Sequence, residues 1–272
     1  MGRIDIRNAL APTFVTGGRY DGIAILGGDG VAFGGHCAAQ SLCAAAAQAG
    51  RDRLPNSIHS TFLSAVVPDE PVSYEVTWLK QGRAFSVLRV DARQRQRVCL
   101  TSVISFHVDE HGPSHQIIAP EVALPELCRS LDFIPPGTNP EVRSCFDIRE
   151  AAPAQADPAG HPAQTCWLRC RQPLGDDGHA HAGALVWFSD LSMPWTADLP
   201  YLGTGPRIGA SLDHSLWFHR RFSVDDWLMF VQESPIYVGA RAFTRGMFFT
   251  QDGKLVATAA QETLVRRPGA TP

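Results

Sequence analysis

The feature that most constrains this 272-residue chain is an uninterrupted apolar run at residues 182–188. The run lies inside a longer segment, residues 179–195, between a turn-like stretch at residues 173–178 and Pro194. A segment that is apolar on every face is either a buried strand or a helix that is buried all round. Because this run is long and contains Ala and Leu, we expect a helix over residues 179–193, surrounded by other structure.

A carboxylate, Asp190, stands just past this apolar run. Removing an ionised carboxylate from water costs several kcal/mol, roughly, unless hydrogen bonds or nearby solvent compensate it. The residues alone therefore leave two interpretations of Asp190 open. It is either a helix-end carboxylate that faces water or a buried acid with a function.

Composition excludes several classes of protein. Hydrophobic residues make up 44% of the chain, which supports one large domain or two small ones. The net charge of −3 gives no general attraction to nucleic acid or to an anionic membrane. No apolar stretch is long enough to span a bilayer, and no secretory signal is seen. Seven cysteines, mostly in apolar runs, indicate reduced thiols in a cytoplasmic protein.

The first half of the chain predicts one helix followed by strands. An Ala-rich helix without charged residues is expected over residues 37–49, between Phe33-Gly34-Gly35-His36 and Gly50, which would end it as a C′ glycine. Four strands with tight connections then indicate an antiparallel meander, at residues 59–63, 72–78, 83–92 and 98–108. A helix followed by a meander is the order required by a helix wrapped in one curved sheet.

A proline-rich segment divides the chain. Residues 113–162 contain many of its prolines, and we interpret them as a linker with short ordered pieces, among them a brief helix at residues 121–131. The expected halves are therefore residues 1–112 and 163–272.

The second half repeats the plan of the first. A strand at residues 166–171 precedes the apolar helix, and further strands at residues 208–219 and 227–231 lead into a meander that ends at residue 266. Aligned without gaps from Arg83 and Arg241, the two halves place Val103 opposite Gln261. An apolar residue in one copy and an amide in the other suggest that only the second copy retains chemistry, although an exposed strand face would give the same pattern.

Several other motifs are better explained as structural features. The glycine-rich segment at residues 26–30 lacks the Gly-Lys-Ser/Thr ending of a phosphate loop and predicts a hairpin turn. His179 and His181 lack an evident third ligand, so no metal or cofactor is expected. His214 and His219 are interpreted as structural residues on a strand. Asp213 is the second candidate, after Asp190, for a functional carboxylate. We expect it either to be exposed at a sheet edge or to form an ion pair.

Residue motifs in both halves resemble the acyl-CoA thioesterase II (TesB-like) family. The first half contains F-G-G-H-C-A-A-Q at residues 33–40 and N-S-I-H-S-T-F-L at residues 56–63. The second contains A-S-L-D-H-S-L-W-F-H-R at residues 210–220 and T-Q-D-G-K-L-V-A-T-A-A-Q-E at residues 250–262. The resemblance implies an α+β double hotdog, in which two helices are each wrapped by an antiparallel sheet and the two sheets are continuous.

The resemblance also implies three site residues. The family's active-site Asp, hydroxyl residue and Gln fall on Asp190, Ser211 and Gln261, with Ser211 standing where the best-known members have Thr. The implied reaction is hydrolysis of an acyl-CoA or acyl-carrier thioester to free acid and thiol. A carboxylate, a hydroxyl and an amide can hold one water, and Asp190 can accept its proton. None of the three is a strong nucleophile with a paired base, so no acyl-enzyme is expected.

Two alternatives to hydrolysis remain open at this point. Hotdog hydratases and dehydratases carry a D-x-N-P-x-H pattern, whereas Asp190 is followed by L-S-M-P-W and Trp195 stands at the His position. A non-hydrolytic double hotdog, either an acyltransferase or an acyl-binding protein in a biosynthetic pathway, is the stronger alternative. Acyl-CoA is the expected partner, with neither nucleic acid nor membrane, and a homo-oligomer through the hotdog sheets is compatible with the sequence.

Overall fold

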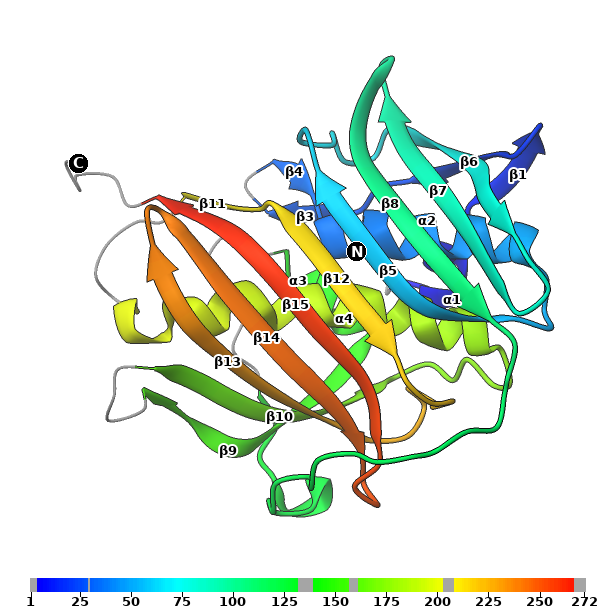
Figure 1. Cartoon of the computed structure of the whole chain (residues 1–272). Coiled ribbons are helices and arrows are strands. Elements are labelled where there is room, and N and C mark those ends of the chain that lie inside the picture. The colour runs from blue at the N-terminus through cyan, green and yellow to red at the C-terminus, as the bar shows by residue number, and fades with distance from the viewer. Residues whose placement is uncertain (1–3, 29, 132–138, 157–160, 203–207, 267–272) are drawn as a thin grey trace.

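The computed structural model describes residues 4–28, 30–131, 139–156, 161–202 and 208–266. Two long helices, α2 (Gly34–Ala49) and α4 (Gly178–Asp198), lie side by side behind a large sheet (Figure 1). They run antiparallel, because the start of α2 at Gly35 lies against Asp190 while Gly183 of α4 lies against Cys43. The remaining helices are short: α1 (Ile6–Leu10), α3 (Pro140–Ser144) and the 3-10 turns Pro125–Leu127 and Leu199–Tyr201.

The strands form one curved antiparallel sheet. Its order is β1-β2-β6-β7-β8-β5-β12-β15-β14-β13-β10-β9, with β11 added beside β15. The first half supplies β1 (Thr13–Thr16), β2 (Arg19–Ile23), β5 (Leu54–Phe62), β6 (Pro71–Gln81), β7 (Phe85–Gln94) and β8 (Arg97–His107). The second supplies β9 (Phe146–Ala156), β10 (Pro162–Cys170), β11 (Ile208–Ser211), β12 (Asp213–Phe218), β13 (Leu228–Val238), β14 (Arg241–Thr250) and β15 (Leu255–Arg266).

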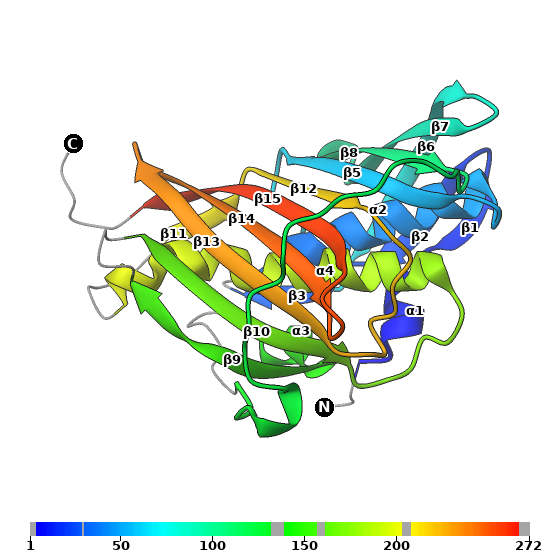
Figure 2. The same ribbon diagram turned by 60° about the horizontal axis from the view of Figure 1, so that its bottom comes forward.

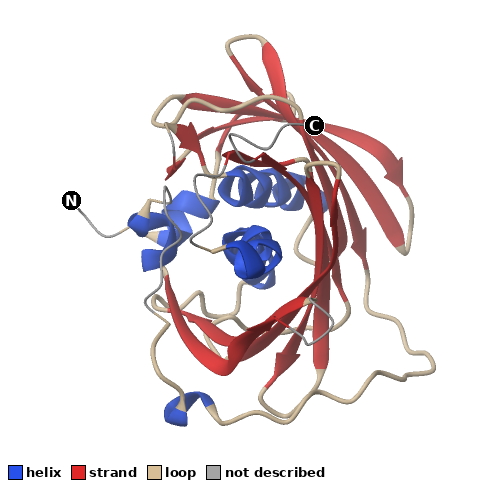
Figure 3. Cartoon of the chain, turned by 90° about the vertical axis from the view of Figure 1, so that its left-hand side faces the viewer, coloured by secondary structure: helices blue, strands red, loops and turns tan. Residues whose placement is uncertain are grey.

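The two halves join at β5 and β12. These strands pair antiparallel from Thr61 with Asp213 to Ser57 with Trp217, so the sheet continues from one half into the other. Viewed from its side, the sheet curves around both helices (Figure 3). Leu26–Gly28 (β3) and Val31–Ala32 (β4) form a separate small hairpin before α2. The expected double hotdog with continuous sheets is confirmed.

Both long helices are buried as expected. Every residue of the apolar run at residues 182–188 is buried against the inner face of the sheet or against α2. The side chain of Asp177 caps α4 by accepting hydrogen bonds from the backbone N–H groups of His179 and Ala180. Gly50 ends α2 with a φ of 93°, in a conformation that favours glycine. Among the described residues, no helix is both long and apolar enough to cross a membrane.

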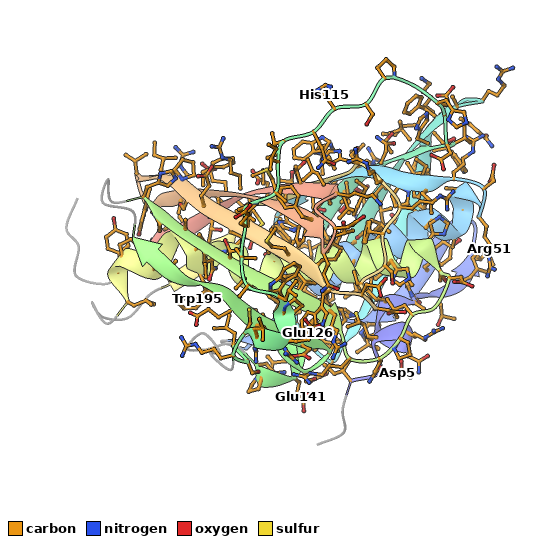
Figure 4. The ribbon with its side chains drawn as sticks, turned by 90° about the horizontal axis from the view of Figure 1, so that it is seen from below. Asp5, Arg51, His115, Glu126, Glu141 and Trp195 are labelled. Atoms are coloured by element: carbon orange, nitrogen blue, oxygen red, sulfur yellow. The ribbon has the colours of Figure 1, made fainter. Side chains whose placement is uncertain are left out.

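The described parts of the expected linker, residues 113–131, 139–156 and 161–162, are more ordered than the sequence suggested. The expected helix at residues 121–131 is only a 3-10 turn at Pro125–Leu127, and β9 occupies residues that the proline-rich composition assigns to the linker. Residues 108–124 cross the outer face of the sheet, where Figure 2 shows them passing in front of the strands and Figure 4 marks them at His115. We therefore propose that the second half of the chain begins before β9.

An outer cluster of side chains holds this linker in place. Trp167, Trp227, Met229 and Phe249 are buried on the outer side of the sheet under Ala119, Val122 and Cys128. Hydrogen bonds add to this packing, because Trp167 Nε1 donates to Ala123 O at 2.9 Å and Gln116 Nε2 donates to Gly253 O at 2.8 Å. The linker thus covers apolar surface that would otherwise face water.

The gapless alignment of the two halves fails in their last strands, β8 and β15. There it is shifted by an odd number of residues from the correspondence that the structure shows. Gln261 is fully buried on the inner face, whereas Val103 lies between the buried inner residues Ser102 and Ile104 and therefore points outward. Because side chains alternate along a strand, such a shift exchanges the two faces. The inner-face row through Gln261 continues across the joint to Ser102, not to Val103.

His36, which follows the two glycines of the F-G-G motif, is a buried structural residue. Its side chain is fully buried, its Nδ1 accepts from the Ile25 N–H at 3.4 Å, and its Nε2 lies 2.8 Å from Ala9 O. The accepting Nδ1 assigns the proton to Nε2, which therefore donates to Ala9 O. Burial lowers the pKa of His36 to about 4, against a smaller opposing effect of the Ala9 carbonyl.

This lowered pKa predicts acid-dependent stability. In the unfolded chain His36 takes up a proton near pH 6.5, whereas the folded protein resists it down to about pH 4. The contribution of His36 to stability is therefore complete above about pH 6.5 and falls by up to about 3 kcal/mol as the pH drops to about 4.

Urea unfolding of wild type and His36→Gln between pH 4 and pH 8 tests this prediction. The variant should lose part of the slope of unfolding free energy against pH. Burial also lowers the pKa of His214, so this residue should maintain the slope that is left in the variant. Equal slopes in the two proteins would contradict the assignment.

Candidate active site

Asp190 is buried at the contact between the two long helices. Its side chain is 5% exposed, and its Oδ2 accepts a hydrogen bond from the Gly35 N–H at 2.7 Å. That N–H belongs to the first turn of α2, whose N-cap residue Phe33 makes no side-chain capping bond. Asp190 therefore caps α2 from a different helix. The partial positive charge of the helix N-terminus favours the carboxylate there.

Glycine is required where the two helices meet. A Cβ on Gly35 would lie 2.7 Å from Asp190 Cβ and 3.0 Å from Trp187 O. A Cβ on Gly34 would lie 2.9 Å from the Phe62 ring. Contacts this short do not fit an ordinary side chain, so the Gly-Gly pair of the F-G-G motif allows α2 to approach Asp190 closely.

Ser211 and Gln261 complete a compact cluster with Asp190. Ser211 ends β11, and Gln261 lies on the inner face of the adjacent strand β15. Gln261 Nε2 donates to Asp190 Oδ1 at 2.5 Å and to Ser211 Oγ at 2.7 Å, while Ser211 Oγ donates to Asp190 Oδ1 at 3.3 Å. The sequence-predicted residues are thus brought together by three different elements.

Neutral donors satisfy the carboxylate of Asp190. One oxygen has the backbone N–H of Gly35, and the other has the amide of Gln261 and the hydroxyl of Ser211. Hydrogen bonds to a charged acceptor are stronger than those between neutral groups, and a buried carboxylate needs them. The cluster remains open on one side, because Ser211 and Gly34 are only partly buried.

Sequence reasoning missed two groups beside the cluster. His214 of β12 is 1% exposed, and its Nε2 lies 2.7 Å from the Oγ of Ser189, the residue before Asp190. His214 lies near the cluster only because β12 pairs with its neighbours in the sheet. The sequence could at most have indicated that His214 faces the inner side of its strand. The site also depends on the N–H of Gly35, which no side-chain pattern specifies.

The other candidates have structural partners. Asp213 Oδ1 accepts from the Glu262 N–H at 2.9 Å, and His219 contacts Thr258. His179 contacts Arg53 O, while His181 contacts Gly175 O and accepts from the Val224 N–H. Within the described ranges, no three His, Cys, Asp or Glu side chains come together to hold a metal ion.

A separate cavity of about 320 Å³ lies at the N-terminal end of α4. Its walls include Gly178, His181, Phe218 and Arg220, none of which touches Asp190. The side chain of Asp177 already occupies the helix N-terminus at this end. The cavity is therefore distinct from the polar cluster.

Comparison with known proteins extends these observations. Residues 146–264 match the family model described as acyl-CoA thioesterase, and residues 26–107 match the model described as acyl-CoA thioesterase N-terminal domain. Acyl-CoA thioesterase 2 of Haemophilus influenzae is 33% identical over 250 residues, which cover 86% of this chain and 87% of that protein. The chain belongs to the acyl-CoA thioesterase II (TesB-like) family.

Other members of this family agree in sequence and structure. Human acyl-coenzyme A thioesterase 8 is 32% identical over 258 residues, covering 86% of this chain and 80% of that protein. The crystal structure of the acyl-CoA thioesterase II TesB2 of Mycobacterium marinum superposes with a TM-score of 0.84 at 32% identity. That match covers 98% of this chain and all of the other. The family that the motifs in both halves indicated is thus confirmed.

The tight contact at Gly35 yields a prediction. Gly35→Ala should force α2 and Asp190 apart, which should lower the free energy of unfolding by about 1–3 kcal/mol and also reduce turnover. Gly183→Ala is a matched control, since its Cβ would meet Cys43 Sγ at 2.8 Å in the same helix pair but away from the cluster.

Urea unfolding and thiol-release kinetics on both variants separate the two effects. We expect both to lose stability and only Gly35→Ala to lose kcat in its folded fraction. A Gly35→Ala protein with full kcat would show that the close approach to Asp190 is dispensable.

Proposed function

We propose that this enzyme hydrolyses acyl-CoA thioesters with a water molecule held by Asp190, Ser211 and Gln261. The reaction class is that of the acyl-CoA thioesterase family, to which the chain belongs. The observation that supports these three residues is their mutual contact, with every pair within 3.3 Å. A water that contacts two of these groups is therefore within reach of the third.

In the proposed mechanism Asp190 is the general base. It accepts a proton from the water as the water oxygen attacks the thioester carbonyl carbon. When the tetrahedral intermediate collapses, the carbon–sulfur bond breaks. The proton on Asp190 then passes to the departing thiolate, which gives free acid, CoA thiol and the original carboxylate. Ser211 and Gln261 orient the water, and no covalent acyl-enzyme is required.

The developing oxyanion needs hydrogen-bond donors of its own. The first N–H groups of α2 have no acceptor within the helix, and Phe33 supplies no cap. The N–H of Gly35 is already bonded to Asp190, so we assign the oxyanion to its neighbours in the first turn.

The setting of the reaction is also part of the proposal. We infer a cytoplasmic enzyme, supported by seven cysteines that are all free thiols. Burial raises the pKa of Cys37, Cys43 and Cys166 to about 12, so these thiols are poor nucleophiles at neutral pH. Association of copies through the hotdog sheets and a role in fatty-acid metabolism remain predictions.

Asp190→Asn tests the assignment of the base. The amide cannot accept the proton of water, so kcat for acyl-CoA hydrolysis should fall by roughly 10²–10⁴. The assay is thiol release from acyl-CoAs that range from short to long and aromatic chains. Asp213→Asn removes an equal charge from the neighbouring strand while keeping the oxygen that accepts from Glu262, so its kcat should stay close to wild type.

The outcomes distinguish the candidate functions. Unchanged turnover in a folded Asp190→Asn protein would remove Asp190 from the mechanism. Loss of thioester only when a second amine or alcohol is supplied would indicate an acyltransferase. Tight binding of acyl-CoA by wild type without release of thiol would indicate an acyl-binding protein.

A further inference from the structure

We propose that His214 is a positioning residue that fixes the side-chain amide of Gln261 in the orientation that presents Nε2 to Asp190 and Ser211. Its predicted effect on turnover rests on the proposed function, whereas the predicted protonation of its ring does not. Among the described residues, His214 makes its side-chain hydrogen bond to Ser189 and not to the carboxylate of Asp190. It would act through Gln261.

The sheet places His214 and Gln261 beside each other. β12 and β15 pair antiparallel, with Ser215 opposite Ala260, so the next position along each strand brings His214 beside Gln261. Both side chains point to the inner face and are almost completely buried, with exposures of 1% and 0%. Two polar groups in this position must satisfy each other or a close neighbour.

The unpaired atoms of these two side chains are complementary. Gln261 Nε2 uses both hydrogens on Asp190 and Ser211, which leaves Oε1, an acceptor. Gln261 Oε1 and His214 Nδ1 are both buried, and neither has a hydrogen-bond partner of normal geometry within the described structure. Burial lowers the pKa of His214, and the charges of Asp190 and Asp213 and the side chain of Gln261 oppose that effect. An opposing effect of this sign is what an acceptor facing the ring would produce.

The second ring nitrogen decides which tautomer is needed. His214 Nε2 lies 2.7 Å from Ser189 Oγ, whose single hydrogen can go either to this nitrogen or to Val186 O, an acceptor 3.0 Å away. If the Ser189 hydroxyl donates to Nε2, the proton of a neutral imidazole is on Nδ1, where it can be donated to Gln261 Oε1. If the proton is on Nε2 instead, two acceptors, Nδ1 and Oε1, face each other in a buried site.

The resulting chain of hydrogen bonds begins and ends on one helix. In the proposed tautomer the Ser189 hydrogen points to His214 and not to Val186 O, His214 donates to Gln261, and Gln261 donates to Asp190, the residue after Ser189. A rotated Gln261 amide would turn its oxygen toward the Asp190 carboxylate at 2.5 Å and its NH₂ toward the ring. A proton on Nδ1 excludes that rotated state, because donor would then face donor and acceptor would face acceptor.

The first half of the chain offers a natural control. In the same row of the sheet, His214 pairs with Ser60, and Ser60 pairs with Ser102. The two serine hydroxyls bond to each other at 2.8 Å and are as deeply buried as His214. Ser102→Ala therefore breaks a buried polar contact in this row without altering Gln261.

The first experiment determines the protonation of His214 directly. Long-range proton–nitrogen NMR spectra of the full chain labelled with ¹⁵N-histidine, assigned with His214→Gln, should show a neutral ring with its proton on Nδ1 at pH 7. Gln261→Leu should shift the Nδ1 resonance, while Ser102→Ala should leave it unchanged. A ring protonated on Nε2 alone would overturn the proposal, whether or not the enzyme hydrolyses any substrate offered.

The second experiment uses the two amide replacements of histidine. Asn places its NH₂ near the position of Nδ1, and Gln places its NH₂ near that of Nε2. With an acyl-CoA that wild type hydrolyses, His214→Gln should lower kcat about tenfold or more with KM changed less than about twofold. His214→Asn should stay within about threefold of wild type, and Ser102→Ala should match wild type.

The pattern across the variants decides between positioning and packing. Equal losses of kcat in His214→Asn and His214→Gln, measured per folded molecule, would overturn the positioning role. If wild type releases no thiol from any acyl-CoA, the proposed function fails, and the NMR result alone then decides the role of His214.

Discussion

The structure depends on the hydrogen bond between the Gly35 N–H and the carboxylate of Asp190. It joins the start of one long helix to the middle of the other and closes the contact between the two halves of the chain. Both glycines of the F-G-G motif serve this approach, since a side chain at either position would collide with Asp190, Trp187 or Phe62. A buried charge is tolerated there because a helix N-terminus and two polar side chains face it.

Asp190 lies where the two halves of the chain meet, so the docking of the halves also completes its hydrogen-bonding environment. Gln261 and Ser211 come from strands of the second half, whereas Gly35 comes from the first, so the donors around Asp190 assemble only when the halves dock. The continuous pairing of β5 with β12 holds the halves in one register and prevents the donors from sliding past each other. Rigidity of this kind suits a reaction that requires one water molecule in one orientation.

Much of this could be predicted from the sequence, and the failures have physical causes. Uncharged segments that are apolar on every face predicted both long helices, and the resemblance to the family pointed to Asp190, Ser211 and Gln261. The alignment failed in the last strand, where an odd shift turned the outward-facing Val103 into the apparent counterpart of an inward-facing amide. β9 was missed because Pro153 argues against a strand, yet an edge strand tolerates proline. The F-G-G motif marked the glycines at this contact, but the bond from the Gly35 N–H to Asp190 could not be predicted, because any residue except proline has such a donor.

The two long helices of this duplicated fold begin differently. α4 closes its own N-terminus with Asp177, so its first backbone donors are already occupied. α2 begins with Phe33, which has no such group, and its donors are left for a carboxylate from elsewhere. The amino-acid sequence already shows this difference, because the N-cap position of α2 is a phenylalanine and that of α4 is an aspartate. The two copies thus differ in one capping residue, which decides whether a helix start is closed locally or by a distant side chain.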